Sequence, residues 1–280
     1  MATASVESFP VRTLRRVSSV VFGFFWYYLP FNEFRKMQFY SDEEMVSMFL
    51  DGYSIARYGD GELRIANNTP SDFFQKNDKK LAGKLSDIAS SSDAKVIICF
   101  PKPLSTLKGL GLNARLFWIS NSFWNRKEWR KMINLHKKYG NTQITRPYMD
   151  YRNKGNAQER YDNLKLAWNE KKICIIEGEE THLGEGNDLF KNAKTIKRII
   201  APAKNAYDDF ENILKKALSV DKDYLFLIAL GPTATVLSYE LAKRGRTAFD
   251  VGHIDIEYEW MLNSAKRKVL VDGKAVNEKE

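Results

Sequence analysis

The sequence is poor in cysteine and histidine, and this scarcity excludes several kinds of site. Only two cysteines and three histidines occur among 280 residues, so a disulfide framework and a cysteine-rich zinc site are both excluded. Cys99 and Cys174 each lie within an apolar run, and we expect both to be buried free thiols. This cysteine usage favours a reducing compartment, and we expect the cytoplasm.

The apolar segment at residues 17–31 is too short to cross a membrane. It has 15 residues, whereas a spanning helix needs roughly 20. It also differs from a secretory signal peptide, because Leu29, Pro30 and Phe31 stand where a small-residue cleavage site would follow.

Acidic residues are outnumbered by basic ones, 35 against 44, which gives a formal net charge of +9. This balance favours anionic partners such as a nucleotide, a phosphorylated substrate or a lipid headgroup. We expect no nucleic acid, because no basic stripe interleaved with stacking aromatic residues lies beside the candidate site described below.

Residues 1–38 form an extension that is basic at first and then apolar. Arg12, Arg15 and Arg16 precede the aromatic-rich segment. One interpretation is a helix packed on the main domain or on a second copy in a homo-oligomer, and we favour it because such segments usually belong to cores. The other is an anchor over residues 12–31 on the inner face of the membrane, with the arginines on anionic headgroups.

Strands alternate with helices of moderate length over residues 39–265. This alternation predicts one α/β domain with a Rossmann-like, mostly parallel sheet and helices on both faces. The expected strands are 53–58, 94–100, 142–148, 172–178, 195–202, 223–230 and 247–252. The expected helices are 41–50, 125–139, 157–170, 205–219 and 234–244. The charged tail, residues 266–280, is expected to fray.

The stretch ARYGDGEL carries two carboxylates, Asp60 and Glu62, on either side of one glycine. Gly59 and Gly61 would let the backbone bend sharply and approach a ligand. Paired carboxylates are a common way to hold magnesium or manganese together with phosphate oxygens. The alternative is an ordinary surface turn, because Asp-Gly is frequent in turns.

The stretch IIEGEETHLGEGNDLF follows a buried strand and is rich in glycine and acid. Its backbone N–H groups could serve phosphate or sugar hydroxyls, and Asn187 and Asp188 could bind a ribose or hexose or could cap the following turn. We include Gly178, Thr181 and Asn187 among the donor-binding candidates and Glu177 among the catalytic ones. The alternative is a solvated acidic loop.

The stretch LGPTATVLSYELAKRG is predicted to be a strand, a tight turn and a helix. The unpaired N–H groups and dipole of the helix start would suit a pyrophosphate, which makes Gly231, Thr233 and Thr235 donor-binding candidates. The alternative is a threonine that simply caps the helix.

In DVGHIDIEYEW, the polar residues alternate with apolar ones, and they are His253, Asp255, Glu257 and Glu259. In an extended segment all four would share one face, whereas in a helix after Gly252 the pair Asp255 and Glu259 would do so. His253 could bind a metal or phosphate or act as a base, or it could be a core histidine.

Six motifs occur in the same order as in the GT-D fold glycosyltransferases, bacterial enzymes first described as a domain of unknown function. The chain resembles this family from about Phe39 to Met261. The motifs are ARYGDGEL, ITRPYMD, IIEGEETHLGEGNDLF, RIIAPAKNAYDDF, ALGPTATVLSYELAKRG and DVGHIDIEYEW. The resemblance implies a GT-D type domain that moves a sugar from a UDP-sugar to a glycan acceptor with the help of a divalent cation, and it places the family's D-x-E motif on Asp60 and Glu62.

The resemblance also implies an acceptor in surface glycoprotein or exopolysaccharide biosynthesis, and the N-terminal extension would suit a lipid-linked one. We expect a hexose such as glucose as the donor sugar. Arg57 or Arg146 could contact the diphosphate, although Arg57 could equally pair with a nearby carboxylate. In an inverting enzyme, Asp255 or Glu177 would take the acceptor's proton. The alternatives are a metal-dependent phosphohydrolase or nucleotidyltransferase, and a membrane-peripheral scaffold.

Overall fold

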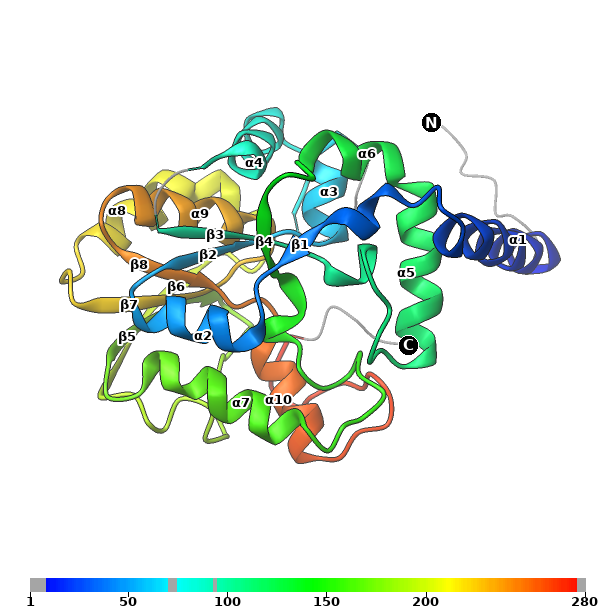
Figure 1. The fold of residues 1–280 in the computed structure, drawn as a ribbon. Coiled ribbons are helices and arrows are strands. Elements are labelled where there is room, and N and C mark those ends of the chain that lie inside the picture. The colour runs from blue at the N-terminus through cyan, green and yellow to red at the C-terminus, as the bar shows by residue number, and fades with distance from the viewer. Residues whose placement is uncertain (1–8, 70–74, 93–94, 276–280) are drawn as a thin grey trace.

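The computed structural model describes residues 9–69, 75–92 and 95–275. Its centre is an eight-stranded sheet in the order β1-β4-β3-β2-β8-β7-β5-β6, in which every neighbouring pair is parallel (Figure 1). The strands are β1 (Gln38–Phe39), β2 (Ser54–Arg57), β3 (Val96–Phe100), β4 (Lys138–Asn141), β5 (Lys172–Gly178), β6 (Thr195–Ala201), β7 (Tyr224–Ala229) and β8 (Thr247–Asp250). The predicted parallel α/β fold is confirmed.

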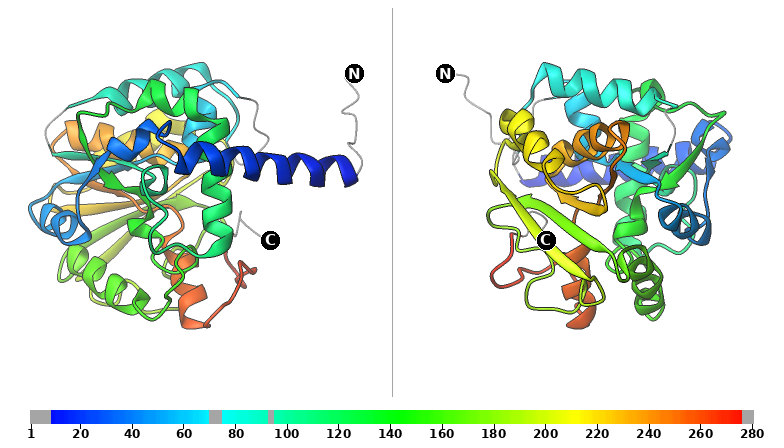
Figure 2. Two further views of the ribbon diagram at one scale, coloured as in Figure 1. Left: turned by 45° about the vertical axis from the view of Figure 1, so that its right-hand side comes forward. Right: turned by 90° about the vertical axis from the view of Figure 1, so that its left-hand side faces the viewer.

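Two helical layers cover the sheet, one on each face (Figures 1 and 2). One layer contains α3 (Asp60–Ala66), α4 (Lys79–Ser90), α6 (Arg126–Met132), α8 (Phe210–Leu218) and α9 (Pro232–Lys243). The other contains α2 (Asp42–Leu50), α7 (Ala157–Lys165) and α10 (Ile254–Leu262). At one end of the sheet, α1 (Phe9–Tyr28) packs against α5 (Leu112–Trp124).

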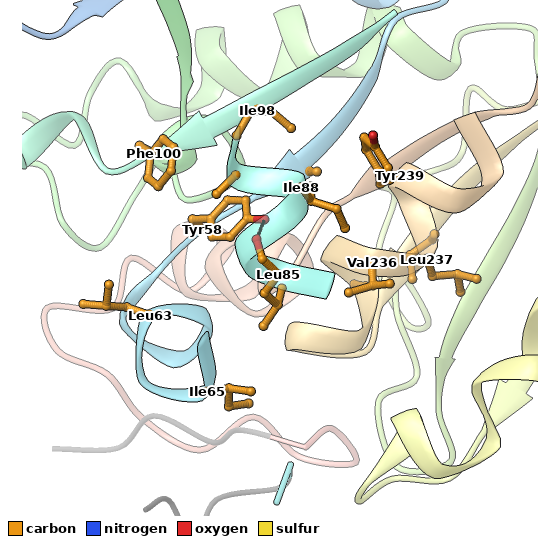
Figure 3. Close-up of a cluster of buried hydrophobic side chains, with 14 of the residues drawn as sticks. Tyr58, Leu63, Ile65, Leu85, Ile88, Ile98, Phe100, Val236, Leu237 and Tyr239 are labelled. Carbon is orange, nitrogen blue, oxygen red and sulfur yellow. Dashed lines mark hydrogen bonds between the residues drawn. The ribbon is translucent and has the colours of Figure 1, made fainter. Parts of the chain in front are cut away.

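Side chains alternate between the two layers along each strand. Ala56, Ile98 and Phe226 belong to the core on the α9 side, whereas Ile55 and Ile97 belong to the core on the α2 side. Both faces are therefore buried, which explains the nearly continuous apolar runs in these strands. Figure 3 shows part of the first core, where β3 meets α3, α4 and α9.

Two predicted elements around β4 are wrong. The helix expected at 125–139 ends at Met132, and the strand lies at 138–141 instead of 142–148. Residues 142–145 form a 3₁₀ turn, because the Asn141 side chain accepts a hydrogen bond from Gln143 N at 3.1 Å and caps it. The sequence KYGN lacks the β-branched residues that mark most strands, so local propensity pointed to TQIT instead.

The predicted start of α2 is confirmed. Ser41 Oγ accepts a hydrogen bond from Glu44 N at 3.1 Å, and Glu44 Oε2 accepts one from Ser41 N at 2.7 Å. This reciprocal pair satisfies two N–H groups that the helix cannot pair internally. Cys99 and Cys174 are both buried free thiols, as predicted.

The inner side of α1 is packed on the domain, as we favoured. An added Cβ on Gly23 would lie 2.8 Å from Ile119 O, so the absence of a side chain lets α1 and α5 cross closely. Tyr27 is buried and its hydroxyl donates to Pro103 O at 2.7 Å. Within the described ranges, no helix combines the length and apolar character needed to span a membrane.

The expectation that the tail frays does not hold for residues 266–275. Trp260 Nε1 donates to Val269 O at 3.0 Å, and Ala275 N donates to Glu180 O at 2.8 Å. These bonds hold the segment against α10 and the loop after β5. Residues 276–280 lie outside the described residues.

Candidate active site

The sheet has a topological switch point between β2 and β8. The chain continues from β2 to β3 on one side, whereas β8 pairs with β2 on the other. Ligands of open α/β sheets bind in the crevice at the carboxyl edge of such a switch point. Asp60 and Glu62 follow β2 directly, and Asp250 ends β8. These three carboxylates therefore belong to the edge where a ligand is expected.

Asp60 and Glu62 lie in the first turn of α3 and not on the predicted glycine bend. Glu62 Oε2 accepts a hydrogen bond from Gly59 N at 2.7 Å, which closes this turn. Gly59 has a φ of −124°, and a Cβ on Gly61 would meet nothing within 4 Å. Neither glycine is needed for a sharp bend, so that part of the interpretation is wrong. The carboxylate pair itself stands at the predicted end of the strand.

Glu62 is partly buried, whereas Asp60 is exposed to solvent. Burial raises the pKa of Glu62 to about 7, and the negative charge of Asp250 adds to this increase. The ionised form of Glu62 is therefore costly in the protein alone. A positive charge placed beside it would remove that cost.

Asp250 is a buried acidic residue that sequence reasoning did not select. Its Oδ1 accepts hydrogen bonds from Arg57 Nη2 at 3.1 Å and from Arg57 Nε at 3.3 Å. The other terminal nitrogen of Arg57 donates to Thr145 Oγ1 at 2.6 Å and to Thr142 O at 3.3 Å. Arg57 therefore pairs with a carboxylate, one of its two predicted roles. Burial raises the pKa of Asp250, although Arg57 acts in the opposite direction.

Gly252 makes this arrangement of Arg57 possible. Its φ is +50°, in the left-handed region, and an added Cβ would lie 1.9 Å from Arg57 Nη2. The next residue, His253, is partly exposed and precedes α10, where its carbonyl accepts from Glu257 N at 3.0 Å. His253 thus lies at the same carboxyl edge as Asp250.

The threonines at the start of α9 point into the protein. Gly231 is the residue that precedes the helix, and neither threonine caps it. Thr235 Oγ1 lies 2.9 Å from Arg57 O and 3.2 Å from Asp250 Oδ2. Thr233 Oγ1 lies 3.2 Å from Gln75 Oε1, and both side chains are buried. A diphosphate at this helix start would therefore meet backbone N–H groups near Gly231.

Glu177 holds the base of the loop that follows β5. Its Oε2 accepts a hydrogen bond from Leu183 N at 2.6 Å, and its Oε1 pairs with Arg198. Gly178 is packed tightly, because an added Cβ would lie 3.1 Å from Ala203 Cα. Thr181 N donates to Gly178 O at 2.9 Å. These contacts indicate that Glu177 holds the loop in its conformation.

Asp255 and Glu259 share one face of α10, as the helical alternative predicted. Asn187 Nδ2 donates to Asp255 Oδ1 at 2.7 Å and to Glu259 Oε1 at 2.6 Å. From the C-terminal segment, Lys274 Nζ donates to Asp255 Oδ2 at 2.6 Å and to Glu259 Oε1 at 3.0 Å. Burial raises the pKa of Asp255, while the bonds from Lys274 and Asn187 act in the opposite direction. The loop, α10 and the C-terminal segment thus meet at one buried cluster.

Glu257 points to a different part of the molecule from Asp255. Its Oε2 accepts hydrogen bonds from Tyr148 N at 3.2 Å and Met149 N at 2.7 Å, and its Oε1 lies 3.4 Å from Arg146 Nε. The four polar residues of DVGHIDIEYEW therefore do not share one face. Arg146 pairs with Glu257 and anchors the segment after β4.

A divalent cation at Asp60 and Glu62 would have few protein ligands. Across residues 9–69, 75–92 and 95–275, no three His, Cys, Asp or Glu side chains are grouped so that they could hold a metal. A site with two carboxylates would leave the other positions of magnesium or manganese to waters and phosphate oxygens, which these ions often keep as ligands. The costly charge of Glu62 agrees with such a site.

Comparison with known proteins gives consistent matches. The family model described as "Glycosyltransferase GT-D fold" matches residues 55–279. The chain is 34% identical over 234 residues to the probable glycosyl transferase Gly of Streptococcus gordonii and 34% identical over 236 residues to the glycosyltransferase GlyD of Streptococcus pneumoniae serotype 4. Each match covers 83% of this chain but only 34% and 28% of the relative. The chain thus spans about a third of the length of these curated relatives.

Solved structures match over most of their length. One, described as a new glycosyltransferase from Streptococcus sanguinis, has a TM-score of 0.82 at 34% identity and covers 86% of this chain and 91% of that chain. Another, described as a domain of unknown function with a distinct glycosyltransferase fold, has a TM-score of 0.84 at 32% identity and covers 94% and 91%.

Proposed function

The chain belongs to the glycosyltransferase GT-D fold family, and from this premise we propose that it transfers a hexose, such as glucose, from a UDP-sugar to a glycan acceptor. The acceptor would belong to surface glycoprotein or exopolysaccharide biosynthesis, and the reaction would take place in the cytoplasm. Both curated relatives and one solved structure are described as glycosyltransferases, which supports the reaction class.

The environment of Glu62 is the observation that carries the proposal. Its pKa is raised to about 7 by burial and by Asp250, at the sheet edge where a ligand is expected. A carboxylate with a perturbed pKa at such a place is a candidate for function. Asp60 stands two residues before it in the same turn and is open to solvent.

We assign Asp60 and Glu62 to a divalent cation, manganese or magnesium. When bound, this cation would neutralise the negative charge that develops on the UDP leaving group. Because the protein offers two carboxylates and no larger cluster of ligands in the described residues, the donor's diphosphate oxygens would complete the coordination. Gly231 at the start of α9 would place backbone N–H groups near the same diphosphate.

If the reaction inverts the sugar, a carboxylate must take the proton of the acceptor hydroxyl. Of the two residues nominated from the sequence, we retain Asp255. Burial raises its pKa, which makes it a better proton acceptor near neutral pH, and its partner Lys274 comes from the C-terminal segment. Glu177 is held by Arg198 and the loop backbone, and Asp255 by Asn187 and Lys274, so either carboxylate would have to leave these partners before it could accept the proton.

The test is turnover of UDP-sugars by the purified chain with manganese. We expect slow hydrolysis of one sugar donor without an acceptor and faster turnover with a glycan acceptor. Asp60→Asn and Glu62→Gln should each lower the rate by at least about 100-fold, because each removes a negatively charged ligand of the cation that would neutralise the charge developing on UDP. Glu62→Gln keeps an acceptor oxygen for Gly59 N, so its fold should be intact.

Exposed carboxylates outside the proposed site supply the control. Glu211→Gln on α8 and Asp221→Asn before β7 remove the same charges from solvent-exposed positions. Both variants should keep the full rate. Full activity of the Asp60→Asn and Glu62→Gln double variant would refute the metal role. Turnover that no glycan acceptor accelerates would favour a phosphohydrolase.

A further inference from the structure

The outer side of α1 is apolar and uncovered, in contrast to its packed inner side. Residues 20–29 contain no charged side chain, and a helix that is apolar all round normally has both sides buried. Six side chains on and after its outer side are 42–69% exposed: Phe22, Phe24, Phe25, Tyr28, Leu29 and Phe31. Figure 2 shows α1 extending away from the body of the domain.

The apolar surface continues from α1 onto α5. Leu112 and Leu116 are 70% and 37% exposed. They precede Ile119 at intervals of seven and three residues, so they lie on the stripe of α5 that meets Gly23 of α1. We call the outer side of α1 together with this exposed stripe the α1–α5 face. Exposed apolar surface of this extent and continuity marks an interaction site.

The segments that carry this face contain more basic than acidic residues. Residues 9–36 and 112–132, which contain α1, α5 and α6, hold ten Lys and Arg residues but only two Glu. Their net charge is thus +8, and it is +5 without Arg12, Arg15 and Arg16, whose side chains lie outside those the structure describes. Lys36 and Lys127 are among the exposed members of this set. An occupant with both apolar and negatively charged groups would therefore complement the face.

We propose that the α1–α5 face binds the surface of a bilayer that contains anionic phospholipid. The aromatic side chains would enter the boundary between headgroups and acyl chains, and the basic residues would lie against the phosphates. A second copy of the chain fits less well, because a symmetric contact would bring two strongly positive surfaces together. The proposal concerns attachment of the protein to a membrane surface, and it does not depend on the proposed sugar transfer.

The experiment is sedimentation of the full chain with vesicles. It compares vesicles of phosphatidylcholine alone with vesicles of phosphatidylcholine mixed with phosphatidylglycerol. We expect binding to the mixed vesicles, weakening as salt is added. Phe22→Ser with Phe25→Ser should lower the affinity by about tenfold or more, and Lys36→Glu with Lys127→Glu should do the same. These four positions are exposed, so the fold should be unaffected.

Two control pairs separate the face from general surface effects. Ile196→Ser with Ile200→Ser removes comparably exposed apolar side chains from β6, at the far edge of the sheet. Lys215→Glu with Lys216→Glu reverses two exposed charges on α8. Both controls should bind like the unchanged protein. The proposal is overturned if the mixed vesicles are not bound or if the controls lose as much affinity as the α1–α5 variants. It is also overturned if Phe22→Ser with Phe25→Ser instead converts a dimer into a monomer in light scattering.

Discussion

Asp250 is a site residue that could not be selected from the sequence alone. It is the last residue of a short strand, and no second carboxylate or glycine-rich turn marks it. Its importance comes from Arg57, which is 193 residues away in the chain and 3.1 Å away in space. By contrast, Asp60 and Glu62 could be selected from the sequence, because two carboxylates after an apolar strand are visible locally. Pairs formed by folding need the tertiary structure.

Replacing Gly252 should disturb the Arg57–Asp250 pair. Gly252→Ala puts a Cβ where Arg57 Nη2 lies and strains a φ of +50°. Gly245→Ala is the matched control, because its φ is +72° but a Cβ there meets nothing within 4 Å. In urea unfolding, Gly245→Ala should cost about 1 kcal/mol. Gly252→Ala should cost at least about 2 kcal/mol more, since it weakens a buried ion pair. Equal losses would show that Arg57 does not need this space.

Glu62 should make the protein less stable as pH rises. Its pKa is raised from 4.5 to about 7 in the folded protein, so its contribution to stability is complete below pH 4.5 and is lost as pH rises to about 7. Glu62→Gln does not titrate. Between these pH values, the unfolding free energy of the unchanged protein should fall relative to Glu62→Gln by on the order of 3 kcal/mol. Glu211→Gln, at an exposed site, should show no such trend.

At the scale of elements, buried strands were the most predictable part of the fold. The apolar runs that became β3, β5 and β7 are buried on both faces, and their sequences show it directly. The helices α3, α4 and α5 were not predicted. α3 has only seven residues, and Gly59 and Gly61 at its start are typical of a turn. α5 exposes aromatic side chains on the side where polar residues would mark a surface helix. Their helical state is set by packing rather than by local pattern.

The C-terminal segment should contribute to stability through Lys274. Lys274→Met leaves Asp255 and Glu259 without their countercharge in a buried position, where the side chain of Lys274 is 6% exposed. It should cost about 3 kcal/mol at neutral pH. The cost should shrink as pH falls, because Asp255, with its raised pKa, takes up a proton and loses its charge.

Lys172→Met is the control for this loss. Its pair with Asp223 is also 2.6 Å long, but the two side chains are 38% and 55% exposed. Solvent screens such a pair, so thermal or urea unfolding should detect a change below about 1 kcal/mol. A Lys274→Met variant as stable as Lys172→Met would mean that the segment only rests on the surface.

The proposed active site and the proposed membrane-binding face lie on different parts of the molecule. The carboxyl edge beside β2 carries Asp60, Glu62 and Asp250. The α1–α5 face carries exposed aromatic residues in segments of net positive charge, and α1 and α5 lie at one end of the sheet in Figure 1. The sequence showed both the acidic pair and the apolar extension. It could not show that one side of α1 is packed and the other open, because that depends on the crossing with α5. The side of α1 that packs on the domain and the side that we propose binds the membrane are thus opposite each other.

The most direct measurement is a crystal structure of the chain grown with UDP and manganese, with anomalous diffraction collected to locate the ion. We predict one manganese peak within ligand distance of Asp60 and Glu62, bridged to the diphosphate of UDP, and no peak at that position in Glu62→Gln crystals. A manganese–UDP complex bound elsewhere, with both carboxylates turned to solvent, would contradict the proposed site.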